Sequence, residues 1–255
     1  MREIDLPMSI LIKSAKIIDA SSKFNGKTKD IFINQGIIQE IADCIEKKSV
    51  KEINLNNLHV SQGWLDTSVS FGEPGLEERE TIENGSLTAC LSGFTDIILN
   101  SNTLPVIDSK ADVIYVQSKN KNNALKIHPL GALTLKSEGL EMAELREMFD
   151  SGAVGFYDYK MSVKNPNLLK TALQYVQHFD GLIMTFPFEK SICEDGQMNE
   201  GEISTLYGLK GIPSLSEEII LERDLKILEY TGGKLFIPTI STSKSVELIK
   251  SAKQK

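Results

Sequence analysis

Histidine and cysteine side chains are where metal chemistry would be expected first, and their spacing in this sequence does not predict a metal site. The histidines are His59, His128 and His178, and the cysteines are Cys44, Cys90 and Cys193. Zinc ligands usually occur in short patterns such as H-x-H, H-x-x-H or H-E-x-x-H, and none is present. We therefore interpret the histidines as structural, and the three separated cysteines as reduced thiols rather than a disulfide framework.

Serine and carboxylate side chains are the second source of hydrolytic chemistry. Ser68 and Ser70 stand two residues apart, but a serine nucleophile needs a neighbouring base and often a G-x-S-x-G turn. We find neither beside them. Asp158 is a lone acid at the end of an expected strand, where a carboxylate more often binds a loop than transfers a proton.

The charge balance excludes several classes of partner. The 255 residues include 28 Lys and Arg against 35 Asp and Glu, a net charge of −7. A nucleic-acid-binding protein usually has a basic surface instead. No apolar run approaches the ~18 residues of a membrane span, and the first residues lack the apolar core of a signal peptide. We expect a cytoplasmic protein that binds neither nucleic acid nor membrane.

The elements that position these side chains alternate between strand and helix from residue 61 onward. Strands are expected at 63–66, 94–99, 126–131, 153–157, 181–185 and 233–237, with helices near 78–92, 141–150, 166–178 and 214–229 and a last one capped near Ser243. This alternation is typical of a parallel sheet or a (β/α) barrel. About six units fall short of the eight in a complete barrel. In the helix at 214–229, the spacing of Glu217, Glu218 and Glu222 predicts a solvated face.

Residues 1–60 have a different pattern and predict a small β domain. The stretch 9–18 is rich in β-branched residues, and 51–56 continues this β pattern. Residues 30–41 predict a hairpin whose turn needs the positive φ that Gly36 supplies. We therefore divide the chain into a β domain at 1–60 and a barrel-type domain at 61–255. No G-x-G-x-x-G or P-loop pattern supports nucleotide binding.

Several motifs in register resemble dihydroorotase, a member of the cyclic amidohydrolase family. Ser61-Gln-Gly-Trp-Leu-Asp66 is similar to the family strand P-G-[FL]-I-D, Phe71-Gly-Glu-Pro-Gly75 to H-[LF]-R-E-P-G, and the segment 100–108 to M-P-N-T-x-P-V-x-D. Further matches follow in order at 152–156, 198–201, 208–213 and 240–242. The resemblance covers the whole sequence and about the N-terminal three-fifths of a family member.

This resemblance implies the fold and the chemistry to expect. It implies an incomplete TIM-type (β/α) barrel of the amidohydrolase kind, with a small N-terminal β-sandwich. Family members hold two zinc ions through histidines after strands 1, 5 and 6 and an Asp or carboxylated Lys on strand 4. The zinc ions polarise a ring amide and supply hydroxide, which interconverts dihydroorotate and carbamoyl aspartate in pyrimidine biosynthesis.

The family's ligand residues are replaced at most of their positions. By the resemblance, the H-x-H pair falls on Ser68 and Ser70, and the strand-5 and strand-6 histidines fall on Phe186 and Thr239. The arginine that would hold the substrate carboxylate falls on Gly72. Hydroxyl and phenyl groups are poor substitutes for zinc-binding imidazoles. We therefore expect no zinc and no other cofactor.

Two family positions keep their residue type. Asp158 retains one acid of the strand-4 segment, beside Tyr159, and Asn102 matches a substrate-binding asparagine. The catalytic Asp after strand 8 has no counterpart in these 255 residues. We expect the chain to end before strands 7 and 8, whether it is a natural product or a truncated one.

We predict an inactive dihydroorotase homologue with a structural or partner role. Since some inactive family members are structural partners of aspartate transcarbamoylase, that enzyme or a second copy of this chain is the expected partner. The alternative is an active dihydroorotase or cyclic amide hydrolase that uses an unconventional metal site or a missing C-terminal half. A truncated product without independent function is a third reading.

Overall fold

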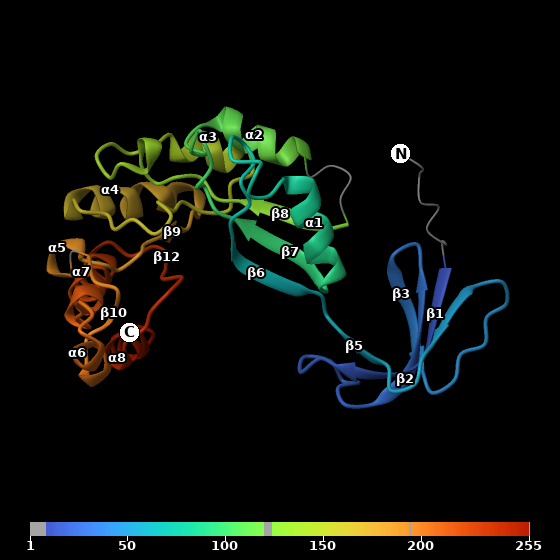
Figure 1. Ribbon diagram of the computed structural model, residues 1–255. Coiled ribbons are helices and arrows are strands. Elements are labelled where there is room, and N and C mark those ends of the chain that lie inside the picture. The colour runs from blue at the N-terminus through green and yellow to red at the C-terminus, as the bar shows by residue number, and fades with distance from the viewer. Residues whose placement is uncertain (1–8, 120–123, 194, 255) are drawn as a thin grey trace. The chain divides into compact units, whose positions relative to one another are not determined.

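The structure, a computed structural model, describes residues 9–119, 124–193 and 195–254. The chain forms two compact units, Met1–Gly63 and Trp64–Lys255 (Figure 1). Each unit has its own strands and its own buried residues, and each is described separately below. No helix among the described residues is long and apolar enough to cross a bilayer.

The first unit is a five-stranded sheet. Its strands are β1 (Ser9–Ile18), β2 (Thr28–Asn34), β3 (Ile37–Ala42), β4 (Lys51–Asn54) and β5 (His59–Ser61). The order is β3-β2-β1-β4, and β5 also pairs with β1. The expected hairpin joins β2 to β3, where Gln35 and Gly36 have φ values of 49° and 75°. Two successive positive φ values match a tight turn between twisted antiparallel strands.

A buried carboxylate stabilises this sheet. Asp30 on β2 is 2% exposed and accepts hydrogen bonds from the backbone N–H groups of Ser14 at 2.8 Å and Ile45 at 2.9 Å. The Lys13 ammonium lies 2.6 Å from it. Burial alone would raise the pKa of Asp30, but Lys13 and the two N–H groups outweigh burial, so the pKa lies below its ordinary value.

The second unit contains six parallel strand segments in chain order. The strands are β6 (Trp64–Val69), β7 (Phe94–Leu99), β8 (Lys126–Pro129), β9 (Ile183–Met184) and β12 (Leu235–Phe236). The segment expected as a strand at 153–157 contributes single parallel bridges, from Phe156 to Gly131 and to Ile183. A separate short pair, β10 (Met198–Asn199) and β11 (Gly211–Ile212), is also parallel. Among the described residues, β6 pairs only with β7 and β12 only with β9, so no closed barrel forms.

Helices follow most of these strands. They are α1 (Ile82–Leu91), α2 (Lys110–Lys119), α3 (Leu145–Asp150), α4 (Pro166–Val176), α5 (Lys190–Cys193), α6 (Glu202–Tyr207), α7 (Leu215–Thr231) and α8 (Ser243–Ala252), with 3-10 turns η1 (Leu135–Ser137) and η2 (Gln177–Phe179). The helices expected from the sequence include neither α2 nor the short α5 and α6. Only Val113 and Val116 of α2 are buried, and two apolar positions make a weak helical pattern.

The central strand β7 carries core residues on both of its faces. Ile97 and Leu99 of β7 belong to the main core, which packs between the sheet and the helices. The intervening Ile98 packs with a second cluster on the other face, which centres on Leu130, Tyr157 and Met184. Side chains alternate between the two faces of a strand. The alternation here gives the two-sided burial of a (β/α) barrel wall.

Candidate functional site

Two serines and two asparagines meet at the carboxyl ends of β6 and β7. The Asn100 side-chain nitrogen Nδ2 lies 3.2 Å from both Ser68 Oγ and Ser70 Oγ. Ser70 Oγ donates a hydrogen bond to Asn102 Oδ1 at 3.0 Å. Ser68 is on β6 and Ser70 directly follows it, while Asn100 and Asn102 lie in the loop that follows β7. This cluster is composed of uncharged hydroxyl and amide groups.

Asn100 is the residue of this cluster that was not expected from the sequence. It is 1% exposed, and its backbone N–H donates to the Val69 carbonyl oxygen at 2.8 Å, which fixes it beside β6. Its side-chain Oδ1 is buried without a hydrogen-bond partner among the described residues. The signal that could have found it is its place directly after the strand expected at 94–99, in the same motif as Asn102.

These side chains do not match the donors that two zinc ions require. Zinc in proteins is bound by thiolate, imidazole and carboxylate groups. The serine hydroxyls are neutral and already bind the Asn100 amide, and a phenyl ring such as that of Phe186 has no donor atom. Nowhere in the described part of the chain do three or more His, Cys, Asp or Glu side chains form a group that could hold a metal ion.

Asp158 lies in a buried loop junction. It is 2% exposed, and its Oδ1 accepts hydrogen bonds from the N–H groups of Leu133 at 2.9 Å and Thr134 at 3.0 Å. Its Oδ2 accepts from the Thr134 hydroxyl at 2.6 Å. Burial raises the pKa of Asp158 above its ordinary value, although these donors oppose the shift. Both carboxylate oxygens therefore bind the loop that follows β8.

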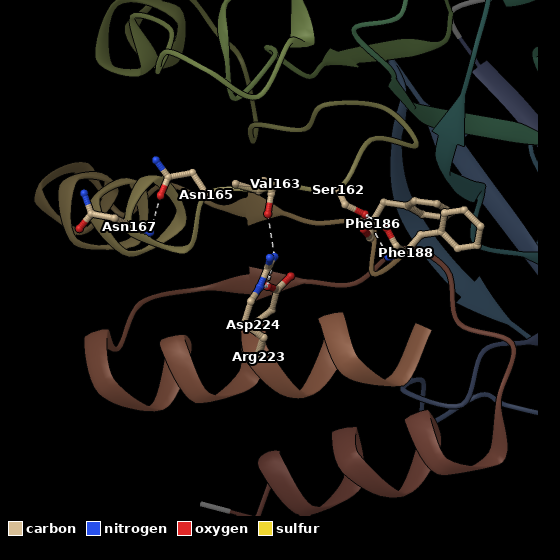
Figure 2. Close-up of polar contacts among 8 residues, drawn as sticks. All are labelled: Ser162, Val163, Asn165, Asn167, Phe186, Phe188, Arg223 and Asp224. Atoms are coloured by element: carbon tan, nitrogen blue, oxygen red, sulfur yellow. Dashed lines mark hydrogen bonds and ion pairs between the residues drawn. The ribbon is translucent and has the colours of Figure 1, made fainter. Parts of the chain in front are cut away.

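Phe186 follows β9, and its backbone is held by a serine hydroxyl (Figure 2). Ser162 Oγ lies 2.7 Å from the Phe186 carbonyl oxygen and accepts a hydrogen bond from the Phe188 N–H at 3.0 Å. The two phenyl rings are 5.8 Å apart, and that of Phe186 packs against the second cluster. An apolar side chain thus stands at the end of this strand, where a hydrolytic site would need a polar one.

Thr239 follows β12 and is exposed. In the described residues its side chain has no hydrogen bond. The loop beyond it is fixed by Glu217 of α7, whose carboxylate accepts from the Ser241 N–H at 2.8 Å and hydroxyl at 2.7 Å and from the Thr242 N–H at 3.1 Å. The expected solvated role of Glu217 is therefore wrong. Its neighbour in that prediction, Glu222, is 55% exposed and pairs with Lys226.

Gly72 lies in a tightly packed loop after β6. Its N–H donates to the Glu80 carbonyl oxygen, and its own carbonyl accepts from the Leu76 N–H, both at 2.9 Å. A Cβ atom on Gly72 would lie 1.8 Å from the Leu76 carbonyl oxygen. The next residue, Glu73, is buried and accepts from the Ile82 N–H at 2.9 Å. An arginine at position 72 would not fit this loop conformation.

Two of the three histidines have local partners. His128 on β8 lies 2.8 Å from the Asp96 carboxylate on β7, through Nε2. His59 Nδ1 lies 2.8 Å from the Asn57 carbonyl oxygen. Each of these two ring nitrogens thus has a hydrogen-bond acceptor on a nearby residue. The third histidine, His178, lies on η2. His128 and His178 belong to different elements of the second unit, and His59 belongs to the first unit.

Comparisons with known proteins agree on the family. The family model described as Dihydro-orotase-like matches residues 59–245. The dihydroorotase of Acetivibrio thermocellus is 38% identical over 247 residues, which cover 96% of this chain and 58% of that protein. The dihydroorotase of Pelotomaculum thermopropionicum is 36% identical over 248 residues, covering 96% of this chain and 57% of that protein. The chain therefore spans a little over half the length of these relatives.

Solved structures share the fold at low sequence identity. The L-hydantoinase (dihydropyrimidinase) of Arthrobacter aurescens aligns with a TM-score of 0.75 and 20% identity, over 96% of this chain and 56% of that one. A D-hydantoinase aligns with a TM-score of 0.71 and 19% identity, over 97% and 55%. These alignments show that the chain shares the fold of these hydantoinases over the part that aligns.

Proposed function

Because this chain belongs to the dihydro-orotase-like family, we propose that it keeps the family fold without catalysing zinc-dependent hydrolysis of a cyclic amide. The observation that carries this proposal is the Asn100 amide, which binds Ser68 and Ser70 at 3.2 Å each. By the resemblance, those serines occupy the positions of two zinc-binding histidines. A hydroxyl bound to a neutral amide is a weak ligand for a borderline-soft cation.

The acid that remains is also poorly placed for proton transfer. Hydrolysis of an unactivated amide needs a polarised carbonyl, an activated water and a group that moves protons. Both oxygens of Asp158 accept hydrogen bonds from the 133–134 loop, at 2.6 to 3.0 Å. This supports a structural role for Asp158.

We assign the chain a structural role in association with another polypeptide. Trp64 and Leu65 on β6 are 65% and 53% exposed, and Phe236 on β12 is 38% exposed. In the described residues each of these strands has one hydrogen-bonded neighbour. Apolar strands with a free edge favour pairing with another chain. The proposed partners are aspartate transcarbamoylase and a second copy of this chain.

Metal content and activity test the catalytic half of the proposal. The purified chain, dialysed after exposure to zinc, should retain far less than one zinc per chain by elemental analysis. The rate of carbamoyl aspartate cyclisation with this chain should equal that of a buffer blank. The Acetivibrio thermocellus dihydroorotase, assayed in parallel, should catalyse the reaction. Stoichiometric zinc together with turnover by this chain would overturn the proposal.

A second candidate function is an active cyclic amide hydrolase, and the 38% identity to a protein named dihydroorotase favours it. It would use an unconventional metal site or groups from another polypeptide. Repeating the carbamoyl aspartate assay with aspartate transcarbamoylase present distinguishes the two functions, because only an active hydrolase would cyclise the substrate. Light scattering at tens of micromolar tests association. If the chain is a 28.3 kDa monomer and does not bind aspartate transcarbamoylase, the partner role is refuted.

A further inference from the structure

The parallel segments of the second unit form one row that follows chain order. β6, β7 and β8 pair in that order, and parallel bridges from Phe156 to Gly131 and to Ile183 continue the row to β9 and β12. β6 and β12 are therefore the two ends of the row (Figure 1). Within the part of the chain that the structure describes, each end strand has a hydrogen-bonded neighbour on one side, so its other edge can pair.

Strand β6 lies open to solvent on both faces. Trp64 and Leu65 are 65% and 53% exposed, and successive side chains of a strand point to opposite faces. None of the six residues of β6 is buried, whereas β7, β8 and β9 each contain buried residues. Parallel strands are normally covered on both faces. The apolar start of β6 therefore has the composition of a covered strand at an uncovered end.

The helices that follow the two end strands also have apolar side chains in contact with solvent. Leu87 and Leu91 lie one turn apart on α1 and are 57% and 81% exposed. On α8, Ser245 is the only buried residue, so none of its apolar side chains is buried. A groove of about 730 Å³ lies between α7 and α8, and its apolar lining includes Leu225, Leu228, Leu248 and Ala252. Helices of globular proteins usually bury such stripes against a neighbour.

Two further β/α units match what both ends require. A closed (β/α) barrel has eight strands, and the six segments of this row leave two. Parallel strands are connected through helices, so a unit that pairs with an end strand also brings a helix for α1 or α8. The two hydantoinases that share this fold are longer than this chain, which covers 56% and 55% of them.

We propose that a separate polypeptide closes this row by donating two parallel β/α units, one strand pairing with β6 and the other with β12. The inference rests on the association with another polypeptide proposed above, and it specifies what that polypeptide contributes. Closure removes both free edges. It also buries Trp64 and Leu65 at one end and the apolar side chains of α8 at the other.

The dihydroorotase of Acetivibrio thermocellus supplies the probe, because this chain matches 58% of it. The unmatched part of that enzyme, purified as a fragment, is added to the full chain, and the matched part of the same enzyme is the positive control. Trp64 is the only tryptophan of the chain, so labelling the chain with fluorotryptophan gives one fluorine resonance, which reports on β6. We expect a one-to-one complex by light scattering at about 10 μM, in which the fluorine of Trp64 is no longer accessible to solvent.

Matched variants identify the surface. Leu65→Lys places a charge on the free edge and should weaken the complex about ten-fold. Leu140→Lys is the control, since Leu140 is 79% exposed in the loop between η1 and α3, outside the row, and it should bind as the parent does. Val246→Lys, on α8 and 39% exposed, should weaken the complex from the other end. Thermal melts check that each variant folds.

Assaying the complex separates this inference from the proposed function. A complex that does not cyclise carbamoyl aspartate supports both, and one that does supports the inference together with the second candidate function. The inference is overturned if the fragment binds the matched part of its own enzyme but not this chain, or if Leu140→Lys weakens binding as much as Leu65→Lys. A chain that binds only a second copy or aspartate transcarbamoylase also overturns it, while the proposed association stands.

Discussion

Replacing Asp158 with alanine should destabilise the second unit strongly. The N–H groups of Leu133 and Thr134 have the Asp158 carboxylate as their acceptor, at 2.9 and 3.0 Å, and both residues are 0% exposed. Each buried donor left without an acceptor costs about 1–3 kcal/mol, so two cost about 4 kcal/mol. For a unit of this size the melting temperature should fall by about 10 °C.

Asparagine at the same position separates hydrogen bonding from charge. Asp158→Asn keeps an oxygen that can accept from both N–H groups, so it should cost about 1 kcal/mol at neutral pH. Burial raises the pKa of Asp158 in the folded state. Its protonation therefore stabilises the fold below the unfolded-state pKa, and this contribution is lost as pH rises through the folded-state pKa. The stability of the parent relative to Asp158→Asn should increase as pH falls.

Urea unfolding followed by circular dichroism, at several pH values, measures both effects. Asp150→Ala is the control, since this carboxylate is 54% exposed and pairs with Arg146 on the surface; it should change the unfolding free energy by less than about 0.5 kcal/mol. If Asp158→Ala unfolds within about 1 kcal/mol of the parent, the loop does not depend on this carboxylate. The structural assignment of Asp158 would then be wrong.

Three further predictions rest on other contacts. Gly72→Ala should lower the unfolding free energy by about 2 kcal/mol or more, because the added Cβ would lie 1.8 Å from the Leu76 carbonyl oxygen. The control Gly201→Ala, which has open space around its Cβ, should be nearly neutral. Equal urea midpoints for the two variants would contradict the prediction. Asp30→Asn should show the opposite pH trend to the Asp158 variant, because the lowered pKa of Asp30 gives stability that is lost as pH falls through it; a pH-independent difference would count against the ion pair. The double variant Ser68→His, Ser70→His should gain no dihydroorotate hydrolysis over a metal-stripped control, since catalytic groups that act as a unit are non-additive; measurable turnover would refute this.

The order of strands and helices was largely predictable from the sequence. The strand expected at 94–99 matches β7, and the hairpin around Gly36 forms as expected. Both depend on local periodicity and turn chemistry, which neighbouring residues carry by themselves. The segment at 153–157 was less predictable, because it contributes single bridges through Phe156 rather than a regular strand. Short segments like this depend on the strands beside them.

The residue types at the family's ligand positions were also determined by the sequence alone. Ser68, Ser70, Phe186 and Thr239 carry hydroxyl or phenyl groups whatever their surroundings, and the motifs around them identified the family. The sequence could not say what these groups bind. That depends on which strand ends lie side by side, and on the conformation of the loops that follow them.

The partners of the site residues were decided by the tertiary structure. Asn100 meets Ser68 and Ser70 from 32 and 30 residues away, and Asp158 meets Thr134 from 24 residues away. Glu217 has the spacing of a solvated helical face, yet it accepts hydrogen bonds from a loop 24 residues further on. A side chain's sequence neighbours determine its spacing along a helix or strand. Its hydrogen-bond partner is set by how strands and helices distant in sequence pack, since a buried donor or acceptor must find one there.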